Sequence, residues 1–289
     1  MKDSLQRFLF EHLPVRGEFV HLDATWQAVL ERHNYPAPLQ KVLGELMAAA
    51  ALLAATLKFE GSIILQLHGS GPVTLIVVEC TSEQTLRATA KWSGELNGED
   101  LPSLLGTRRF AITLSPTNGA QTFQGVVDLA GGSVAACLEH YMSRSEQLET
   151  RLWLAADTGR AAGMLLQQLP GRAEHDEDGW NRVGHLGSTL TGTELLDVGP
   201  QVLLRRLYHE DDVRLFEPRA VSFRCSCSKQ RVVAMLRMLG RDEVRSIVEE
   251  RETVDVTCEF CNKRYSFDAV DAEQVFAAED VATPGPTRH

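Results

Sequence analysis

Four of the six cysteines in this 289-residue chain lie close together, between positions 225 and 261. They form two pairs, Cys225-Ser226-Cys227 and Cys258-Glu259-Phe260-Cys261, with 30 residues between the pairs. In a reducing compartment, such a tight group of thiols is typical of metal binding or redox chemistry rather than of a static disulfide framework. Four thiolates are a common ligand set for tetrahedral Zn²⁺, with neighbouring sulfurs roughly 3.7 Å apart. The sequence therefore predicts one zinc ion bound by Cys225, Cys227, Cys258 and Cys261.

The two cysteine pairs differ in spacing. Cys258 and Cys261 have the two-residue gap that wraps a chain around a metal, whereas one residue separates Cys225 from Cys227. In an extended segment, positions i and i+2 point to the same side, so both sulfurs of the first pair can reach one metal. That pair can also close on itself as a small, strained disulfide ring. The spacing indicates a site built to be lost, but a structural zinc ribbon that never changes state stays open as an alternative.

Basic residues surround the predicted ligands in the sequence. They are Arg224, Lys229, Arg231, Lys263 and Arg264. Four thiolates around Zn²⁺ carry a net charge of −2, which nearby cations offset. Cations also keep a thiol ionised once the metal leaves, and the thiolate is the form that oxidants attack. This charge pattern favours reactive thiols over inert ones.

The elements that position these cysteines are predicted to be short. Helices are expected over residues 229–239 and 241–250, and strands over 254–258 and 264–267, next to the second cysteine pair. The first helix is amphipathic, with Val232, Val233, Leu236 and Leu239 on one side. A polar tail, residues 281–289, contains two prolines and is predicted to be disordered.

Residues 222–289 are too few to depend comfortably on a core of their own. Structural zinc contributes about 10–16 kcal/mol of apparent binding free energy, which becomes folding free energy in small domains. Loss of the metal is therefore expected to unfold this domain. The unfolding would uncover apolar side chains, namely Val232, Leu236, Leu239, Val244 and Ile247.

The rest of the chain is predicted to be an α+β domain on an antiparallel sheet, followed by a helical connection. Strands and short polar turns alternate with a few helices, the longest of which is expected at 38–57 and is apolar on nearly every side. Three short helices are expected at 180–190, 193–196 and 202–208, after a polar, turn-rich stretch at 170–179. The predicted organisation is a core domain at 1–172, a helical linker region at 173–221 and a zinc-binding domain at 222–289.

Composition excludes several partners. The chain has 29 basic and 39 acidic residues, a net charge of −10, and residues 221–289 alone contain 10 basic and 12 acidic residues. Because nucleic acids and anionic membranes attract clustered Lys and Arg, neither is an expected partner. The longest nearly apolar run, 46–57, is shorter than the roughly 20 residues of a membrane-spanning helix. With no secretory signal recognised at the N-terminus, the expected location is the cytoplasm.

No other residues make a convincing chemical site. Cys80 ends an apolar strand and Cys137 lies among small apolar residues of a predicted helix, so both are expected to be buried and inert. The acidic runs 176–178 and 210–212 are interpreted as solvated surface. The sequence contains no Gly-x-Ser-x-Gly elbow and no Gly-Lys dipeptide of a phosphate-binding loop. The protein is therefore predicted not to be an enzyme.

Around the cysteines, the sequence resembles the redox-regulated 33 kDa chaperonin family of heat-shock proteins. The resemblance extends from Phe216-Glu217-Pro218 through Phe223-Arg224-Cys225-Ser226-Cys227-Ser228 to Cys258-Glu259-Phe260-Cys261 and Tyr265-Ser266-Phe267. Upstream, residues 180–183, 193–196 and 208–213 also look like the middle region of the family. Lys229-Gln230-Arg231 departs from the more charged Arg/Glu sequence expected there, but it leaves the cysteines intact.

The resemblance implies a redox-regulated, ATP-independent holdase. The reduced form would bind one Zn²⁺ and be monomeric and inactive. Oxidation would release zinc and form disulfides between Cys225 and Cys227 and between Cys258 and Cys261. The zinc domain and linker would then unfold, and the protein would form a homodimer and hold unfolded or aggregation-prone clients. Two other hypotheses stay open, a constitutive zinc-stabilised protein-interaction adaptor and an unrecognised enzyme within residues 1–172.

Overall fold

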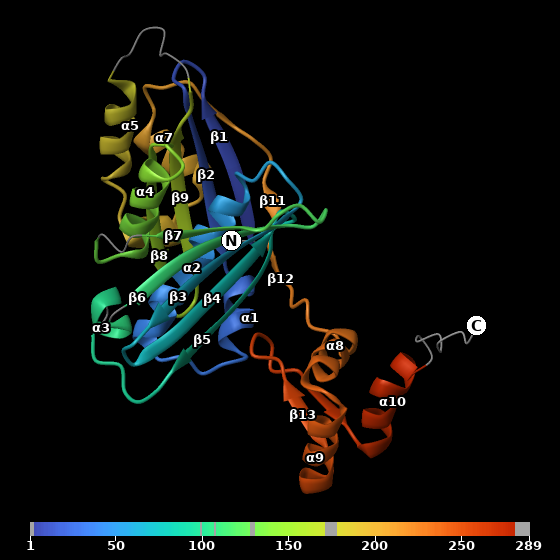
Figure 1. Ribbon diagram of the computed structural model, residues 1–289. Coiled ribbons are helices and arrows are strands. Elements are labelled where there is room, and N and C mark those ends of the chain that lie inside the picture. The colour runs from blue at the N-terminus through green and yellow to red at the C-terminus, as the bar shows by residue number, and fades with distance from the viewer. Residues whose placement is uncertain (1–2, 99, 107, 128–130, 171–177, 281–289) are drawn as a thin grey trace, which may run out of the picture. The chain divides into compact units, whose positions relative to one another are not determined.

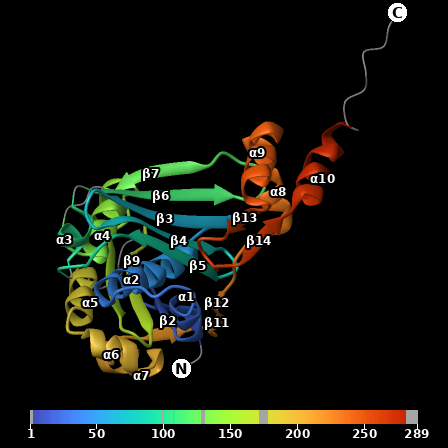
Figure 2. The same cartoon turned by 90° about the horizontal axis from the view of Figure 1, so that it is seen from below.

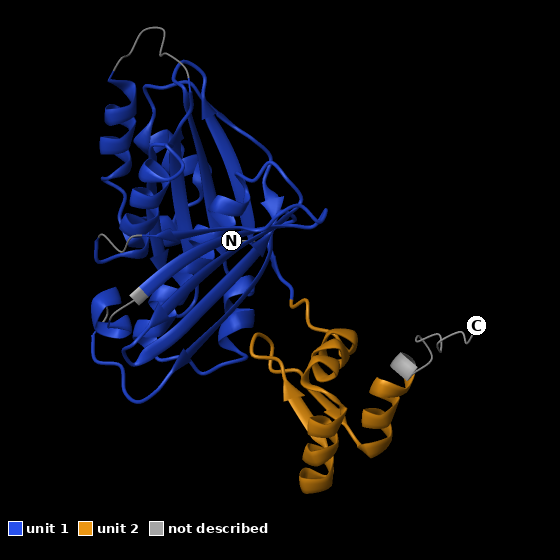
Figure 3. Ribbon diagram, viewed as in Figure 1, with its two compact units in different colours: residues 1–224 blue, residues 225–289 orange. Residues whose placement is uncertain are grey.

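The computed structural model describes residues 3–98, 100–106, 108–127, 131–170 and 178–280. The chain divides into two compact units, residues 1–224 and residues 225–289 (Figures 1 and 3). The class is α+β with largely antiparallel sheets, as the sequence predicts. The three-part division at residues 172 and 221 stays a prediction, and the tail 281–289 and most of the turn-rich stretch at 170–179 lie outside the described residues.

Within the described part of the first unit, the strands form two sheets. Sheet A has the order β10-β1-β2-β9-β8, with β11 also paired to β1, and all its pairs are antiparallel. Its strands are β1 (Ser4–Phe10), β2 (Val15–Leu22), β8 (Thr150–Ala156), β9 (Ala161–Gln168), β10 (Val213–Leu215) and β11 (Arg219–Ala220). Sheet B has the order β12-β5-β4-β3-β6-β7. Its strands are β3 (Gly61–Gly69), β4 (Val73–Thr81), β5 (Thr85–Trp92), β6 (Arg108–Pro116), β7 (Phe123–Val127) and β12 (Ser222–Phe223).

Helix α2 (Ala37–Ala54) lies between the two sheets and is the centre of the main core (Figure 2). Its Leu, Ala and Met residues are strong helix formers, and because both sheets contact it, Leu46 and Met47 are fully buried. Among the described residues, α2 is the one helix that is both long enough and apolar enough to cross a membrane. That property does not identify a membrane span here, because a core helix buried between two sheets has the same composition.

Shorter helices cover the remaining apolar faces of the first unit. They are α1 (Ala24–Leu30), α3 (Leu101–Leu105), α4 (Val134–Arg144), α5 (Gly179–Gly187), α6 (Gly192–Asp197) and α7 (Pro200–Leu207). Ser133 caps α4 through a hydrogen bond that Ala136 N donates to its hydroxyl. Helices α5–α7 bury Val183, Leu195 and Leu203 against the face of sheet A that is opposite α2 (Figure 2).

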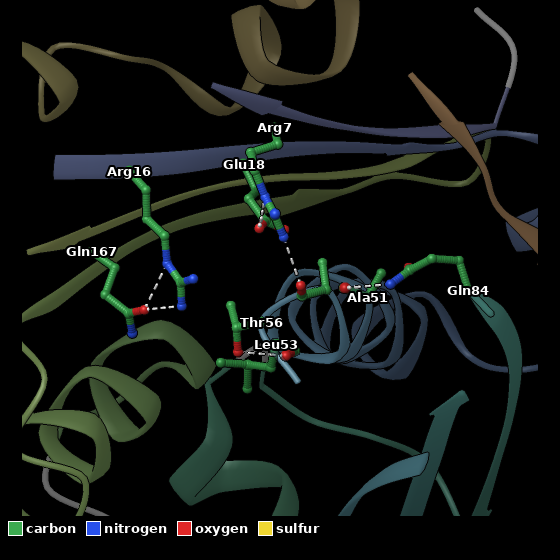
Figure 4. A network of polar contacts seen from close by, with 9 residues as sticks. Arg7, Arg16, Glu18, Ala51, Leu53, Thr56, Gln84 and Gln167 are labelled. Carbon is green, nitrogen blue, oxygen red and sulfur yellow. Dashed lines mark hydrogen bonds and ion pairs between the residues drawn. The ribbon is translucent and has the colours of Figure 1, made fainter. Parts of the chain in front are cut away.

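A partly buried polar network joins sheet A to the C-terminal end of α2 (Figure 4). Arg7 Nε donates to Glu18 Oε1 at 3.1 Å, and Arg7 Nη2 donates to the carbonyl of Ala55, the C-cap of α2, at 2.9 Å. Burial raises the pKa of the Glu18 carboxyl, and the Arg7 guanidinium partly opposes that rise. A cation at a helix C-terminus is electrostatically favourable, so these contacts fix α2 against β1 and β2.

The first unit ends in a segment of short strands that the sequence pattern did not predict. Residues 213–224, here called the strap, form β10 and β11 along the edge of β1 and then β12 along the edge of β5. The β12–β5 pair is parallel, unlike the other strand pairs described. The strap has no long apolar alternation, because its strands are two or three residues long and mostly exposed. This is why its periodicity gave no signal.

The second unit has a small core around a hairpin. Its elements are α8 (Lys229–Leu239), α9 (Arg241–Arg251), β13 (Val254–Thr257), β14 (Arg264–Phe267) and α10 (Ala269–Asp280). The predicted helices and strands are confirmed to within a residue, while α10 was not predicted. Val232, Leu236 and Val244 are buried as expected. Leu239 is 50% exposed, so the prediction that it belongs to the buried face is wrong.

Candidate metal centre

The second cysteine pair lies in the turn of the β13–β14 hairpin. The last ladder pair joins Thr257 to Arg264, and the chain between them is closed by two backbone bonds. Cys258 N donates to the Lys263 carbonyl at 3.0 Å, and Asn262 N donates to the Cys258 carbonyl at 2.8 Å. Asn262 has φ +57°, a left-handed conformation that Asn tolerates better than most residues. The turn therefore holds Cys258 and Cys261 in a tight loop at the end of the hairpin.

The first cysteine pair is held by the start of α8. Ser228 caps the helix by accepting a hydrogen bond from Arg231 N at 3.2 Å. The Arg231 side chain turns back, and its Nη1 donates to Ser226 Oγ at 2.7 Å. Cys227 packs against the small core. The residue between the two cysteines is thus tied to the helix that follows them.

The structure brings all four predicted ligands together. Cys225 Sγ lies 3.6 Å from Cys258 Sγ, and Cys227 Sγ lies 3.4 Å from Cys261 Sγ. All four sulfurs lie within 4.8 Å of one another. These separations suit a metal held by four thiolates, for which neighbouring sulfurs are roughly 3.7 Å apart. The four cysteines can therefore hold a metal ion, and no disulfide joins any of the six cysteines, each of which is described.

One further side chain contacts the sulfurs and was missed by the sequence reading. Tyr265, on β14, donates its hydroxyl to Cys227 Sγ at 3.2 Å and is 7% exposed. Burial raises the pKa of Cys227, but hydrogen bonds from Tyr265 and from the other cysteines outweigh it and lower that pKa to about 7. Burial raises the pKa of Cys261 to about 12. Cys227 is thus the easier of the two to ionise, and the thiolate is the form that binds metal.

The cations near the cysteines are engaged mainly with other groups. Lys229 Nζ is 3.1 Å from Asp271 Oδ1, and Arg264 Nε donates to Asp255 Oδ1 at 3.0 Å. Lys263 Nζ lies 5.2 Å from the centre of the Tyr265 ring. In the described contacts, these three side chains therefore compensate carboxylates or lie over an aromatic ring. Besides the neighbouring cysteine, Cys227 Sγ has the Tyr265 hydroxyl, rather than a cation, as its described polar contact.

The two remaining cysteines belong to the first unit. Cys80 on β4 and Cys137 on α4 are fully buried in the main core, in agreement with the sequence interpretation. Burial also raises the pKa of the Cys80 thiol, so it stays protonated at neutral pH. Within the described residues, the four cysteines of the second unit are the group of His, Cys, Asp and Glu side chains identified as able to hold a metal.

Known proteins similar to this chain carry consistent names. The family model for the Hsp33 protein matches residues 3–268. The 33 kDa chaperonin of Methylobacillus flagellatus is 51% identical over 291 residues, covering 100% of this chain and 99% of the relative. The 33 kDa chaperonin of Chromobacterium violaceum is 52% identical over 289 residues, covering 99% of this chain and 98% of the relative.

A solved structure supports the fold. The crystal structure of the 33 kDa chaperonin (heat shock protein 33 homolog) from Thermotoga maritima superimposes with a TM-score of 0.82 and 22% sequence identity. The match covers 96% of this chain and 99% of that one. At this level of identity the likeness is evidence for the arrangement of helices and strands.

Proposed function

The chain belongs to the Hsp33 protein family, and from this premise we propose that it is a redox-regulated, ATP-independent molecular chaperone. In this proposal the reduced, metal-bound chain is inactive. Oxidation of the four cysteines activates it to hold unfolding proteins under oxidative stress. The observation that carries the proposal is the cluster of four sulfurs within 4.8 Å, in a unit with little core of its own.

The proposed metal is one Zn²⁺, bound by Cys225, Cys227, Cys258 and Cys261. Four thiolates in tetrahedral spacing suit zinc, which has no redox chemistry of its own and would supply binding free energy that stabilises the fold. The residues around the site hold the four cysteines in position before the metal binds. The hairpin turn presents one cysteine pair and the capped start of α8 presents the other.

The small unit depends on that added stability. Its buried apolar side chains are few, and the aromatic ones are Tyr265 and Phe267 on β14 and Phe276 on α10. Such a core seldom stabilises a domain of this length unaided. Loss of the thiolate ligands is therefore expected to unfold α8, α9 and the hairpin together.

Oxidation is proposed to join the cysteines as Cys225–Cys227 and Cys258–Cys261. Each disulfide forms when two thiols give up two electrons and two protons; hypochlorous acid accepts the electrons and leaves as chloride and water. Both disulfides then lie within their own segment, so no disulfide or shared metal ion links residues 225–227 to the hairpin.

The alternative pairing would have the opposite mechanical effect. Sulfurs of different segments lie close to one another, with Cys225 Sγ 3.6 Å from Cys258 Sγ and Cys227 Sγ 3.4 Å from Cys261 Sγ. Disulfides between those pairs would join the two segments covalently and keep the small unit closed. A switch that opens on oxidation therefore requires the pairing within each segment, and disulfide mapping distinguishes the two.

The remaining parts of the proposal follow from the family. The clients are unfolded or aggregation-prone proteins, the oxidised chain forms a homodimer, and the location is the cytoplasm. The protein is proposed not to be an enzyme. Neither nucleic acid nor a membrane is a proposed partner, in keeping with the net charge of −10.

The test measures zinc, disulfides and chaperone activity on the same sample. Reduced, zinc-loaded full chain is treated with hypochlorite, zinc release is followed with a chromogenic chelator, and aggregation of a thermally unfolding client is followed by light scattering. We expect about one zinc per chain to be released and aggregation to be suppressed only after treatment. Peptide mass mapping should find Cys225–Cys227 and Cys258–Cys261.

A Cys137→Ala variant is the matched control, because it removes a thiol buried outside the cluster and should switch like the parent. Retention of zinc with no suppression by the treated protein would refute the switch. Equal suppression by the reduced and treated proteins would instead support the constitutive adaptor.

A further inference from the structure

The first unit contains a cavity of about 490 Å³, which is lined by the start of α7, by residues of β1 and β2, and by the strap. A cavity of this volume suits a small molecule. All of its lining residues belong to the first unit, and none of the four clustered cysteines is among them. The cavity is therefore a separate place in the fold from the candidate metal centre.

The alternation of side chains along β1 decides which groups enter the cavity. Successive residues of a strand point to opposite faces, and residues paired across two strands share a face. Leu5 packs in the main core beside α2, whereas Phe8 packs with α5–α7, so the even-numbered positions of β1 face those helices. Ser4 and Gln6 therefore face α7, and His21 shares their face because it pairs with Ser4. The cavity thus receives a hydroxyl, a carboxamide and an imidazole.

The two charged residues of the lining direct their charges elsewhere. The carboxylate of Asp3 accepts hydrogen bonds from the backbone N–H and the hydroxyl of Thr25, at the start of α1. Arg219 pairs with Leu5, on the α2 side of sheet A, and its Nη2 donates to the carbonyl of Ser82 at 3.1 Å. The described side chains that enter the cavity from β1 and β2 are therefore uncharged polar groups.

His21 supplies the most specific of these groups. It is 2% exposed, and its Nε2 lies 2.9 Å from the carbonyl oxygen of Leu195. A carbonyl oxygen only accepts, so Nε2 carries a proton. Burial lowers the pKa of His21, so the ring is neutral at pH 7 and Nδ1 keeps a lone pair. No described group donates to Nδ1, and a ligand in the cavity with an N–H or O–H would satisfy it.

The other walls of the cavity add complementary groups. Gln6 Nε2 donates to the carbonyl of Phe216 in the strap at 2.7 Å, which leaves Gln6 Oε1 as an acceptor. Gln201 on α7 is exposed and offers a side-chain amide that can donate. Pro200 and Val202 form an apolar wall beside it. Acceptors, a donor and an apolar wall together match a primary carboxamide attached to an apolar ring.

We propose that this cavity binds an uncharged small molecule that carries a carboxamide, or an equivalent pair of N–H and C=O groups, on an apolar ring and donates its N–H to His21 Nδ1. Charged ligands are excluded, because a neutral imidazole and two carboxamides cannot replace the water around a full charge. The inference goes beyond the proposed function and does not depend on the redox switch.

Such a ligand would contact α7, β1 and the strap at the same time. Because it binds these segments only when they are packed together, it stabilises their packing by mass action. At ten times the Kd, local openings that break the cavity should become about 11-fold rarer. Val221 N, which donates to the Asp3 carbonyl at 3.3 Å beside the cavity, reports such openings through its rate of hydrogen exchange.

The test uses three probes that share a benzene ring, namely neutral benzamide, anionic benzoate and cationic benzylammonium. They are titrated into the reduced, zinc-loaded full-length chain with ¹⁵N-labelled histidine, and the imidazole signals are followed by NMR. A ligand of benzamide's size should bind with a Kd of about 1–10 mM. We expect benzamide to move the His21 Nδ1 signal more than the Nε2 signal. Benzoate and benzylammonium should bind at least tenfold more weakly.

Variants place the probes in the cavity. His21→Gln keeps a side-chain N–H for the Leu195 carbonyl but removes the Nδ1 acceptor, so benzamide should bind at least tenfold more weakly. Val202 is 62% exposed, so Val202→Lys and Val202→Glu should both fold, which circular dichroism checks. As a matched pair they put opposite charges on the same wall. Val202→Lys should tighten benzoate binding at least threefold, and Val202→Glu should do the same for benzylammonium.

Three outcomes overturn the proposal. Benzoate or benzylammonium binding to the parent chain as tightly as benzamide would refute the uncharged class of ligand. Benzamide that leaves the His21 signals unchanged at ten times the expected Kd would show that the cavity does not bind it. Unchanged affinities in both Val202 variants would place the probes elsewhere. If His21→Gln does not fold, the parent titration and the Val202 pair decide the question.

Discussion

Replacement of Cys225 by serine removes one of the four sulfurs and leaves the hairpin turn that holds Cys258 and Cys261 intact. Structural zinc binds with about 10–16 kcal/mol at neutral pH, so each of four similar ligands contributes about 2.5–4 kcal/mol. A tenfold change in affinity corresponds to about 1.4 kcal/mol. We therefore expect Cys225→Ser to weaken zinc binding roughly 100-fold to 1,000-fold.

The assay is competition with a chromogenic chelator, using reduced full-length chain. Hydrogen exchange on the same samples should show faster exchange at the β13–β14 amides in the variant, because the hairpin loses its connection to residues 225–227. Cys137→Ala controls for general effects of losing a thiol and should keep the parent Kd. A Kd for Cys225→Ser within about threefold of the parent would refute the four-ligand site and leave a three-cysteine site in its place.

Three other changes test the surroundings of the site and the core. Tyr265→Phe keeps the packed ring but removes the O–H that donates to Cys227 Sγ. Because a hydrogen bond to a charged group contributes about 1.5–3 kcal/mol, the zinc Kd should rise roughly 10-fold to 100-fold in the chelator assay. An unchanged Kd would contradict the role of Tyr265. Phe267→Ala empties a fully buried position of the small core and should cost about 3–5 kcal/mol, measured as faster hydrogen exchange in α8 and the hairpin but not in the first unit. Burial raises the pKa of Glu45 to about 7; because the folded pKa lies above the unfolded one, the wild type loses stability as pH rises through 7. Glu45→Gln should then gain about 1–3 kcal/mol in urea unfolding at pH 8.5 and less toward pH 5, and a gain independent of pH would show that ionisation is not the cause.

The four cysteines that the structure brings together were all predicted, because their signal in the sequence is local. Two short cysteine spacings predict a tetrathiolate site without knowledge of the fold. Helix α8 and strand β14 were predicted with their observed bounds, since Ser228 is a cap residue and the apolar spacing is regular. Residue type and periodicity were sufficient for these elements.

The missed features depend on partners distant in the sequence. Helix α10 was not among the predicted elements. It packs on α9 and α8, and the periodicity of a sequence does not reveal such contacts. In the sequence, Tyr265 has the pattern of an ordinary strand residue. Only the folded hairpin places its hydroxyl beside Cys227 Sγ. The exposure of Leu239 reflects where α8 ends at Gly240, rather than its place in the apolar spacing.

The sequence alone was sufficient to predict the cluster of four cysteines, the class of the fold and the family, because these depend on residue types and short spacings. The tertiary structure decided which edges the strap covers, which hydroxyl reaches Cys227, and that α2 lies buried between two sheets. Each of these depends on pairing between segments far apart in the chain. Backbone hydrogen bonds that hold a strand such as β12 are available to almost any residue, so its position is set by the partner strand rather than by its own side chains.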